Sequence, residues 1–368
     1  MTAIFNSMAF NVIHTCLPSA HVHMVSDINS IAACNFPSLP DWVSARHCYD
    51  TPPKATVHQA IELAQLARGA AALLAVGSGT INDLCKYAAH LLHVPYAVVA
   101  TAPSMNGYVS PNASLIMGQH KQSVEASAPV AVFYDDNVLS HAPPRLVHAG
   151  IGDTLCYSTV KADLMLAHHL INAEPYDTLR HAMEKDEAQL HYALKEGGDV
   201  TLALMQALLS SGRAMAIAQS SAPASQGEHM IAHYLEMISP DISHYYHGEI
   251  IAVTTMMMAK LWQKAQEMTG QLIKRKMFPF AALENRFGQA QTHQWQKAYE
   301  EKWSYILPSA TFPDMSEYIP DVAMLEHFLT QAGCPIVPSD IGIDDNMMNE
   351  AVTYAAFTRN RFTLLDVI

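Results

Sequence analysis

The sequence has few charged residues, and basic residues are the scarcer kind. Only 15% of the 368 residues are charged, and 21 Lys and Arg stand against 34 Asp and Glu. The densest basic cluster is Lys274-Arg275-Lys276. Proteins that bind a phosphate backbone usually present a basic face. We therefore expect no nucleic-acid partner.

Paired cysteines and long apolar runs are missing too. The six cysteines, at positions 16, 34, 48, 85, 156 and 334, form no Cys-x-x-Cys pair, a pattern typical of reduced thiols in a cytosolic protein. No apolar run approaches the ~18 residues that a bilayer span needs. The first eleven residues contain no Lys or Arg and so do not resemble a secretory signal. We expect a cytoplasmic protein without membrane insertion.

Apolar residues, in contrast, are plentiful. They make up 50% of the chain, which is enough for a large core and two domains. Helix and strand patterns alternate in the first part, with helices expected at 55–68 and 81–92 and strands at 21–25, 71–76, 96–100 and 130–134. Helix, strand, glycine turn, helix, strand is the order of a parallel α/β sheet.

The pattern changes after Gly150. Five apolar stretches with helical spacing follow, at 155–170, 176–194, 201–219, 224–237 and 250–268, and no convincing strand separates them. We therefore predict an α/β fold with a Rossmann-like, nucleotide-binding domain at 1–149 and an all-α-helical domain at 150–368. A cleft between two such domains is the default ligand site.

A glycine turn joins the strand at 71–76 to the next helix. It reads Gly77-Ser78-Gly79-Thr80, followed by Asp83. Backbone N–H groups at a helix start favour a diphosphate, although such a segment is as often only a tight turn. Asn82 stands where the dinucleotide fingerprint has glycine, and no Gly-Lys follows as in a P-loop. Asp27 follows the strand at 21–25, where it is either a ribose ligand or a surface aspartate.

Three histidines have spacing that suits a metal site. His229 and His233 are four residues apart and share one helical face, and His247 begins the next helical stretch. Met230 replaces the glutamate that a zinc-protease motif requires after its first histidine, so that class is excluded. The remaining alternatives are one divalent metal or ordinary helix histidines bonded to their neighbours.

Asp153 is the candidate acidic partner. It follows a glycine-rich segment, Gly150-Ile-Gly-Asp153, where an aspartate is usually a helix N-cap or first-turn residue. As an alternative, it supplies the anionic ligand that two histidines lack. One Asp and two His leave a coordination position open, as a Lewis-acid site requires.

Together these motifs carry a resemblance to a known family. Val76-Gly-Ser-Gly-Thr-Ile-Asn-Asp83, Thr101-Ala-Pro-Ser-Met-Asn-Gly107, Gly150–Asp153, Gly227-Glu-His229 and His247-Gly248 resemble the iron-containing alcohol dehydrogenase superfamily in order and spacing. That superfamily includes glycerol dehydrogenases and dehydroquinate synthases. The Thr-Ala-Pro-Ser loop and the tail Thr358–Asp366 look most like its sn-glycerol-1-phosphate dehydrogenase branch.

The resemblance implies a metal-dependent, NAD(P)-linked interconversion of dihydroxyacetone phosphate and sn-glycerol 1-phosphate. It implies that Asp153, His229 and His247 hold the metal and that His233 and Asn106 face the substrate. The residues implied for the cofactor are Gly77, Ser78, Gly79, Thr80, Asp83, Thr101, Ser104 and Ser110. Asp27, which lies before the region of resemblance, is a cofactor candidate from its place after a strand. The resemblance also implies a homo-oligomer. One Asp and two His suit Zn²⁺, Fe²⁺ or Ni²⁺, with Zn²⁺ preferred here.

The chain departs from this branch at the substrate side. Asn106 stands where the branch usually has Asp, and Ala222 where relatives commonly have Arg. Three alternatives therefore stay open: a dehydrogenase of another small polyol, a dehydroquinate-synthase-like cyclase, and a non-catalytic nucleotide-binding relative. Asp153 argues against the cyclase, which has Glu at that position. The choice between NAD and NADP depends on whether Asp27 meets the ribose.

Overall fold

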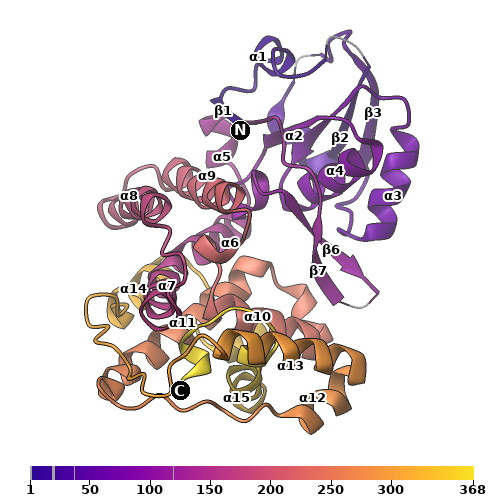
Figure 1. Cartoon of the computed structure of the whole chain (residues 1–368). Coiled ribbons are helices and arrows are strands. Elements are labelled where there is room, and N and C mark those ends of the chain that lie inside the picture. The colour runs from indigo at the N-terminus through magenta and orange to yellow at the C-terminus, as the bar shows by residue number, and fades with distance from the viewer. Residues whose placement is uncertain (1, 19–20, 37, 119) are drawn as a thin grey trace. The chain divides into compact units, whose positions relative to one another are not determined.

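The computed structural model describes residues 2–18, 21–36, 38–118 and 120–368 (Figure 1). The chain divides into two compact units. The first comprises Met1–Gly150 and Asp186–Ile217, and the second comprises Ile151–Lys185 and Ala218–Ile368. Each unit is described here by itself.

The first unit is built on a six-stranded parallel sheet. Its strand order is β1-β8-β5-β4-β2-β3. The bounds are β1 Ala3–Asn6, β2 Val22–Asp27, β3 Val43–Tyr49, β4 Ala72–Gly77, β5 Tyr96–Ala100 and β8 Ala131–Tyr134. This sheet confirms the predicted α/β fold.

Alternate residues of the central strands enter two separate cores. In β4, Leu73 and Ala75 belong to one core, while Ala72, Leu74 and Val76 belong to the other. Every residue of β4 and β5 is buried. Helices therefore cover both faces, which explains why these strands read as continuous apolar runs rather than as alternating ones.

Short helices and one hairpin complete the first unit. The helices are α1 Phe10–His14, α2 Ile28–Cys34, α3 Val57–Leu66, α4 Gly79–Leu92 and α5 Asp136–Ser140. Strands β6 (Asn112–Met117) and β7 (His120–Glu125) form an antiparallel pair.

Helix α9, Val200–Ala218, also packs with the first unit. Met205 and Leu209 join the core that holds Tyr108 and Val109. The first segment of this unit ends at Gly150, and residues 186–217 form its second segment. The domain assignment by function stays a prediction.

By length and composition, α9 is also apolar enough to cross a membrane. It is the one helix of this kind in the described part of the chain, and 44% of its apolar window is buried inside the protein. A core helix passes the same test, so this observation is weak evidence for a membrane span.

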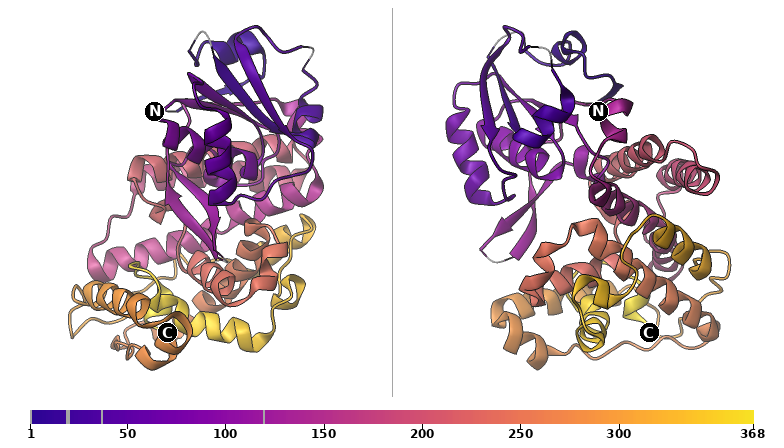
Figure 2. Two further views of the ribbon diagram at one scale, coloured as in Figure 1. Left: turned by 90° about the vertical axis from the view of Figure 1, so that its right-hand side faces the viewer. Right: turned by 180° about the vertical axis from the view of Figure 1, so that it is seen from behind.

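The second unit is helical, and no sheet occurs among its described residues (Figure 2). Helices α6 (Pro144–Leu155) and α8 (Asp177–Glu196) run across the division between the units. The remaining helices are α7 Tyr157–Ile171, α10 Gly227–Ile238, α11 His247–Ala265, α12 Phe280–Phe287, α13 Gln289–Trp303, α14 Val322–Gln331 and α15 Asp345–Tyr354.

Helix α6 was not expected, because its glycines read as a turn. Asp153 lies inside this helix, so its interpretation as an N-cap or first-turn residue is wrong. The two glycines allow close packing instead. A Cβ at Gly150 would collide with the carbonyl oxygen of Pro103, and a Cβ at Gly152 would collide with the carbonyl oxygen of Gly248.

Candidate functional site

Helix α10 carries His229 and His233 on one face. Its opposite side is held in the core by Met230, Ile231 and Leu235, which are all fully buried. The two imidazole centroids are 6.2 Å apart, as expected for residues one helical turn apart. Hydrophobic periodicity therefore fixes which way both imidazoles point.

Asp163 of α7 anchors the start of α10. Its Oδ2 accepts a hydrogen bond from the Gly227 backbone N–H at 2.9 Å, and its Oδ1 accepts one from the Leu364 N–H at 2.8 Å. A Cβ at Gly227 would press against Met258 and this carboxylate. The carboxylate thus ties the helix start, two residues before His229, to the C-terminal tail.

His247 is the first residue of α11. The backbone N–H of Tyr246 donates to Glu249 Oε2 at 2.7 Å, which fixes the start of this helix. The His247 imidazole centroid lies 5.3 Å from that of His229 and 5.4 Å from that of His233. Three imidazoles from two helices therefore gather in one place.

Asp153 reaches the same place from α6. It is 4% exposed, and its Oδ1 lies 3.6 Å from His229 Nε2. One ligand atom from each of Asp153, His229 and His247 falls within 4.8 Å of the others. Ligands bound at about 2.0–2.2 Å lie at most ~4.4 Å apart. The cluster therefore fits a divalent cation after small side-chain adjustments.

Two buried glutamates orient the three imidazoles. Glu228 Oε1 accepts from His229 Nδ1 at 2.8 Å. Glu236 accepts from His233 Nδ1 at 2.9 Å through Oε2 and from His247 Nδ1 at 3.3 Å through Oε1. With each Nδ1 donating, each imidazole in its neutral form keeps the Nε2 lone pair for a ligand. Carboxylates orient metal-binding histidines in this way.

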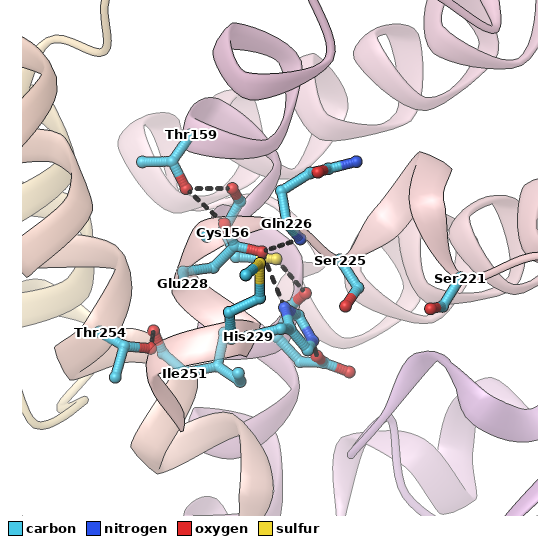
Figure 3. A network of polar contacts seen from close by, with 12 residues as sticks. Cys156, Thr159, Ser221, Ser225, Gln226, Glu228, His229, Ile251 and Thr254 are labelled. Atoms are coloured by element: carbon cyan, nitrogen blue, oxygen red, sulfur yellow. Dashed lines mark hydrogen bonds and ion pairs between the residues drawn. The ribbon is translucent and has the colours of Figure 1, made fainter. Parts of the chain in front are cut away.

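The Glu228 carboxylate accepts hydrogen bonds from three neighbouring residues (Figure 3). Its Oε1 also accepts from the Gln226 backbone N–H at 2.8 Å, and its Oε2 accepts from Thr159 Oγ1 at 3.1 Å. Cys156 Sγ, in the same network, donates to the Asp153 carbonyl oxygen at 3.1 Å. The network fixes the tautomer and the orientation of the His229 imidazole.

A second trio, Cys156, Glu228 and His229, also has ligand-type atoms within 4.8 Å of one another. Glu228 Oε1 and His229 Nδ1 are already bonded to each other in that trio, and the Cys156 thiol donates to a carbonyl. The trio with Asp153 and His247 is the better cation site, because it leaves the His229 Nδ1–Glu228 bond in place and uses Nε2, which faces the Asp153 carboxylate.

Electrostatics in the cluster favour a cation. Burial alone would lower the pKa of His229, but the Asp153 and Glu228 carboxylates outweigh burial and raise that pKa to about 8. Burial would raise the pKa of Glu236, but hydrogen bonds from His233 and His247 lower it well below its usual value. Glu236 is therefore ionised and can only accept hydrogen bonds.

The pKa of His233 shifts in the opposite direction from that of His229. Burial and the nearby Arg359 guanidinium lower its pKa, although its hydrogen bond to Glu236 acts in the opposite direction. It is therefore neutral near pH 7, with 30% of its side-chain surface exposed. A neutral, accessible imidazole beside a metal trio suits contact with a substrate.

The glycine turn of the first unit lies at the carboxyl end of the sheet. Gly77 ends β4, and Ser78 precedes α4, whose first turn contains Gly79 and Thr80. The Ser78 side chain makes no capping hydrogen bond. The first N–H groups of this 14-residue helix are thus available to an anion.

Strand pairing brings Asp27 and Thr101 to the same edge. β4 lies between β2 and β5, with Ser26 opposite Val76 and Gly77 opposite Ala100. Ligands of open α/β sheets bind at such carboxyl ends. Asp27 also caps α2, since it accepts from the Asn29 and Ser30 N–H groups and from Ser30 Oγ. Its contact with a ribose stays a prediction.

Asp83 and Ser110 take part in a buried network around Lys86. Lys86 Nζ, which is fully buried, lies 3.6 Å from Asp83 Oδ1 and 3.4 Å from Ser110 Oγ. It also donates to the carbonyl oxygens of Gly107 at 2.6 Å and Asn112 at 3.0 Å. This network holds the loop after β5, so both residues shape the predicted cofactor site whether or not they contact the cofactor.

The same loop carries Ser104 and Asn106. The Ser104 N–H donates to the Ala102 carbonyl at 3.0 Å, and Asn106 begins a short 3₁₀ helix that ends at Tyr108. A Cβ at Gly212 of α9 would collide with the Asn106 carbonyl oxygen, so α9 supports this turn. The predicted substrate role of Asn106 stays a prediction.

Comparisons with known proteins show the family of this chain. The iron-containing alcohol dehydrogenase family model matches residues 39–143. A glycerol-1-phosphate dehydrogenase [NAD(P)+] of Geobacillus stearothermophilus is 30% identical over 302 residues, which cover 80% of this chain and 70% of the relative. The chain belongs to the iron-containing alcohol dehydrogenase family.

Further members of the family are similar in sequence or fold. A glycerol-1-phosphate dehydrogenase [NAD(P)+] of Sulfurisphaera tokodaii is 36% identical over 224 residues, 58% of this chain and 63% of that protein. The crystal structure of a probable glycerol dehydrogenase from Sinorhizobium meliloti matches with a TM-score of 0.64 at 15% identity, and covers all of this chain and 90% of that one. The last comparison shows the shared fold.

The sequence patterns did not point to four side chains that lie around the candidate site. Glu228 and Glu236 hold the imidazoles, and Arg359 and Arg361 come from the C-terminal tail. The spacing signal for the glutamates was present, since Glu228 precedes His229 directly and Glu236 follows His233 by three. No sequence pattern brings the tail to α10.

Proposed function

We propose that this protein is a metal-dependent, NAD(P)-linked dehydrogenase that interconverts dihydroxyacetone phosphate and sn-glycerol 1-phosphate. The convergence of Asp153, His229 and His247 on one point is the observation that carries the proposal. The printed names of the relatives supply the substrate and the cofactor.

The chain's own residues would act in the following way. Asp153, His229 and His247 would hold the cation, with Zn²⁺ as the expected metal and Fe²⁺ or Ni²⁺ as the alternatives. When bound, the cation supplies Lewis-acid polarisation of the carbonyl, and the nicotinamide supplies the hydride. Glu228 and Glu236 would keep the imidazoles oriented throughout.

His233 is the proposed proton-handling group. Its Nδ1 donates to Glu236, so its Nε2 lone pair is free to accept the hydroxyl proton in alcohol oxidation. In carbonyl reduction the same atom would return the proton, directly or through water. A lowered pKa keeps the imidazole neutral and ready to accept.

In the first unit, the N-terminus of α4 would take the cofactor diphosphate. Gly77, Ser78, Gly79 and Thr80 form this turn, and Thr101 follows the neighbouring strand. We infer that Asp27 bonds the adenosine ribose, which would favour NAD because a carboxylate repels a 2′-phosphate. We expect a cytoplasmic homo-oligomer that acts on a small molecule.

The test is an absorbance assay with dihydroxyacetone phosphate and either NADH or NADPH. We expect oxidation that requires both the substrate and the metal, stops when a chelator is added and returns with Zn²⁺. Cofactor binding without turnover on any small carbonyl compound would contradict the proposal. A preference for NADPH over NADH would contradict the role of Asp27 alone.

A further inference from the structure

The C-terminal tail places Arg361 against the turn that leads into α10. Arg361 Nη1 donates to the Ser225 carbonyl oxygen and, at 3.2 Å, to Ser225 Oγ. Its Nη2 donates to Ser221 Oγ at 3.0 Å. These contacts use three of the five guanidinium N–H groups. Ala222 between the serines brings no charge, so Arg361 is the cation at this turn.

Arg359 lies near the other histidine of α10. Its backbone is held two residues before Arg361 by the same Lys302 ammonium, and the charge of its guanidinium helps to lower the pKa of His233. Within the described parts of the chain, the Arg359 side chain makes no hydrogen bond and no ion pair, and Glu236 already serves two imidazoles. A partly buried guanidinium thus stands beside the site with its donors unused.

A buried lysine holds both arginines in position. Lys302 is 2% exposed, and its Nζ donates to the carbonyl oxygens of Ala356 at 2.6 Å, Arg359 at 3.3 Å and Arg361 at 3.1 Å. The same Nζ lies 2.7 Å from Asp366 Oδ1. The backbone that carries the two guanidiniums is therefore fixed from inside the unit.

This arrangement concentrates positive charge. Burial, and next the neighbouring Arg359, lower the pKa of Arg361 to about 10, so this guanidinium stays charged at neutral pH. Arginine side chains such as that of Arg359 keep their charge in proteins. Glu228 and Asp163, two carboxyl groups whose charges act on Arg361, are bonded to the His229 imidazole and to backbone N–H groups. Within the described residues, neither guanidinium forms an ion pair with a carboxylate. A bound anion would therefore stabilise this pair of positive charges.

We propose that Arg359 and Arg361 bind the phosphate group of the substrate, so that this site selects a phosphomonoester over a free polyol. Planar guanidinium groups match phosphate oxygens in pairs, which fits an anion that two arginines share. The Ser221 and Ser225 contacts orient one guanidinium before a ligand arrives. This inference rests on the proposed function and specifies its substrate class.

The first test compares dihydroxyacetone phosphate with dihydroxyacetone as substrates of Arg359→Gln and Arg361→Gln. We expect kcat/KM for the phosphorylated substrate to fall about 10- to 100-fold more than for the other, as charge-assisted hydrogen bonds are lost. Lysine variants should retain part of the activity. Arg68→Gln, an exposed arginine of α3's C-terminal end, is the matched control. Equal losses on both substrates would overturn the proposal.

The second test needs no turnover. Inorganic phosphate should raise the thermal midpoint of the Zn²⁺-loaded wild type, and this rise should shrink in both variants. Should Arg361→Gln fail to fold, Arg359→Gln decides, because that side chain has no hydrogen bond to lose. An unchanged phosphate effect in Arg359→Gln overturns the subsite. Phosphate stabilisation that depends on Arg359, in a protein that never reduces dihydroxyacetone phosphate, supports the subsite and rejects the proposed reaction.

Discussion

Glu236 serves two imidazoles with one carboxylate. Oε2 faces His233 and Oε1 faces His247, and the residue is 10% exposed at its side chain. Because both oxygens accept, one ionised group sets the tautomer of both imidazoles. An amide cannot do this, since one of its two ends is a donor.

Glu236→Gln should therefore misorient one imidazole. We expect Zn²⁺ affinity to fall about 10- to 100-fold, the usual effect of losing a carboxylate that orients a ligand histidine. Competition with a chromophoric chelator measures this affinity without any assay of activity. The matched control is Glu267→Gln, at an exposed position of the same unit, which should bind Zn²⁺ like the wild type. Equal affinities in both variants would show that Glu236 has no such role.

Among the elements, the contact of α6 with α11 decides where Asp153 lies. Gly152 meets the backbone of Gly248 there, directly after His247. The neighbours of these two glycines in sequence are both proposed metal ligands. Because Gly152 and Gly248 have no side chains, α6 and α11 pack closely at this point. The close packing places Asp153 beside the imidazoles.

Gly152→Ala should separate these helices. We expect a loss of about 1–3 kcal/mol in the free energy of unfolding from overpacking, together with weaker Zn²⁺ binding. Chemical denaturation with and without Zn²⁺ measures both effects. Gln289→Ala, at an exposed position of α13, is the control and should change stability by less than about 0.5 kcal/mol. A stable variant with normal metal affinity would refute this account of the helix contact.

Sequence patterns predicted the buried elements and missed the irregular ones. The expected strand 96–100 coincides with β5, because a fully buried parallel strand is one continuous apolar run. Strand β3 was missed, since its residues are mostly exposed or half-buried and carry polar side chains. Helix α6 was missed because Gly150 and Gly152 imitate a turn, while they in fact serve close packing.

The candidate metal ligands could be predicted from the sequence, but the side chains that surround them could not. The helical spacing of His229 and His233 indicates that both imidazoles lie on one face, and the family resemblance added Asp153 and His247 to the candidate ligands. Arg361 lies 136 positions from Ser225 in sequence, and Arg359 is two residues closer. Their approach depends on Lys302, whose burial no local pattern signals. Long-range polar contacts of this kind need the folded structure.

At the scale of the whole molecule, the two predicted sites belong to different compact units. The glycine turn and the Lys86 network belong to the first unit, while the metal trio and the tail belong to the second. Each ligand should therefore protect its own unit against hydrogen exchange. We expect Zn²⁺ to slow exchange at residues 227–233 and 247–251, and NAD at 77–83 and 101–104. Protection by Zn²⁺ at 77–83 in place of α10 would contradict this division.

The most direct test of the central claim is the metal content of the intact chain, measured by native mass spectrometry after Zn²⁺ loading. We predict one ion per chain in the wild type. At the same free Zn²⁺ concentration, Asp153→Asn, His229→Gln and His247→Gln should each lose the ion, and His233→Gln should keep it. An ion that survives all three ligand substitutions would contradict the account.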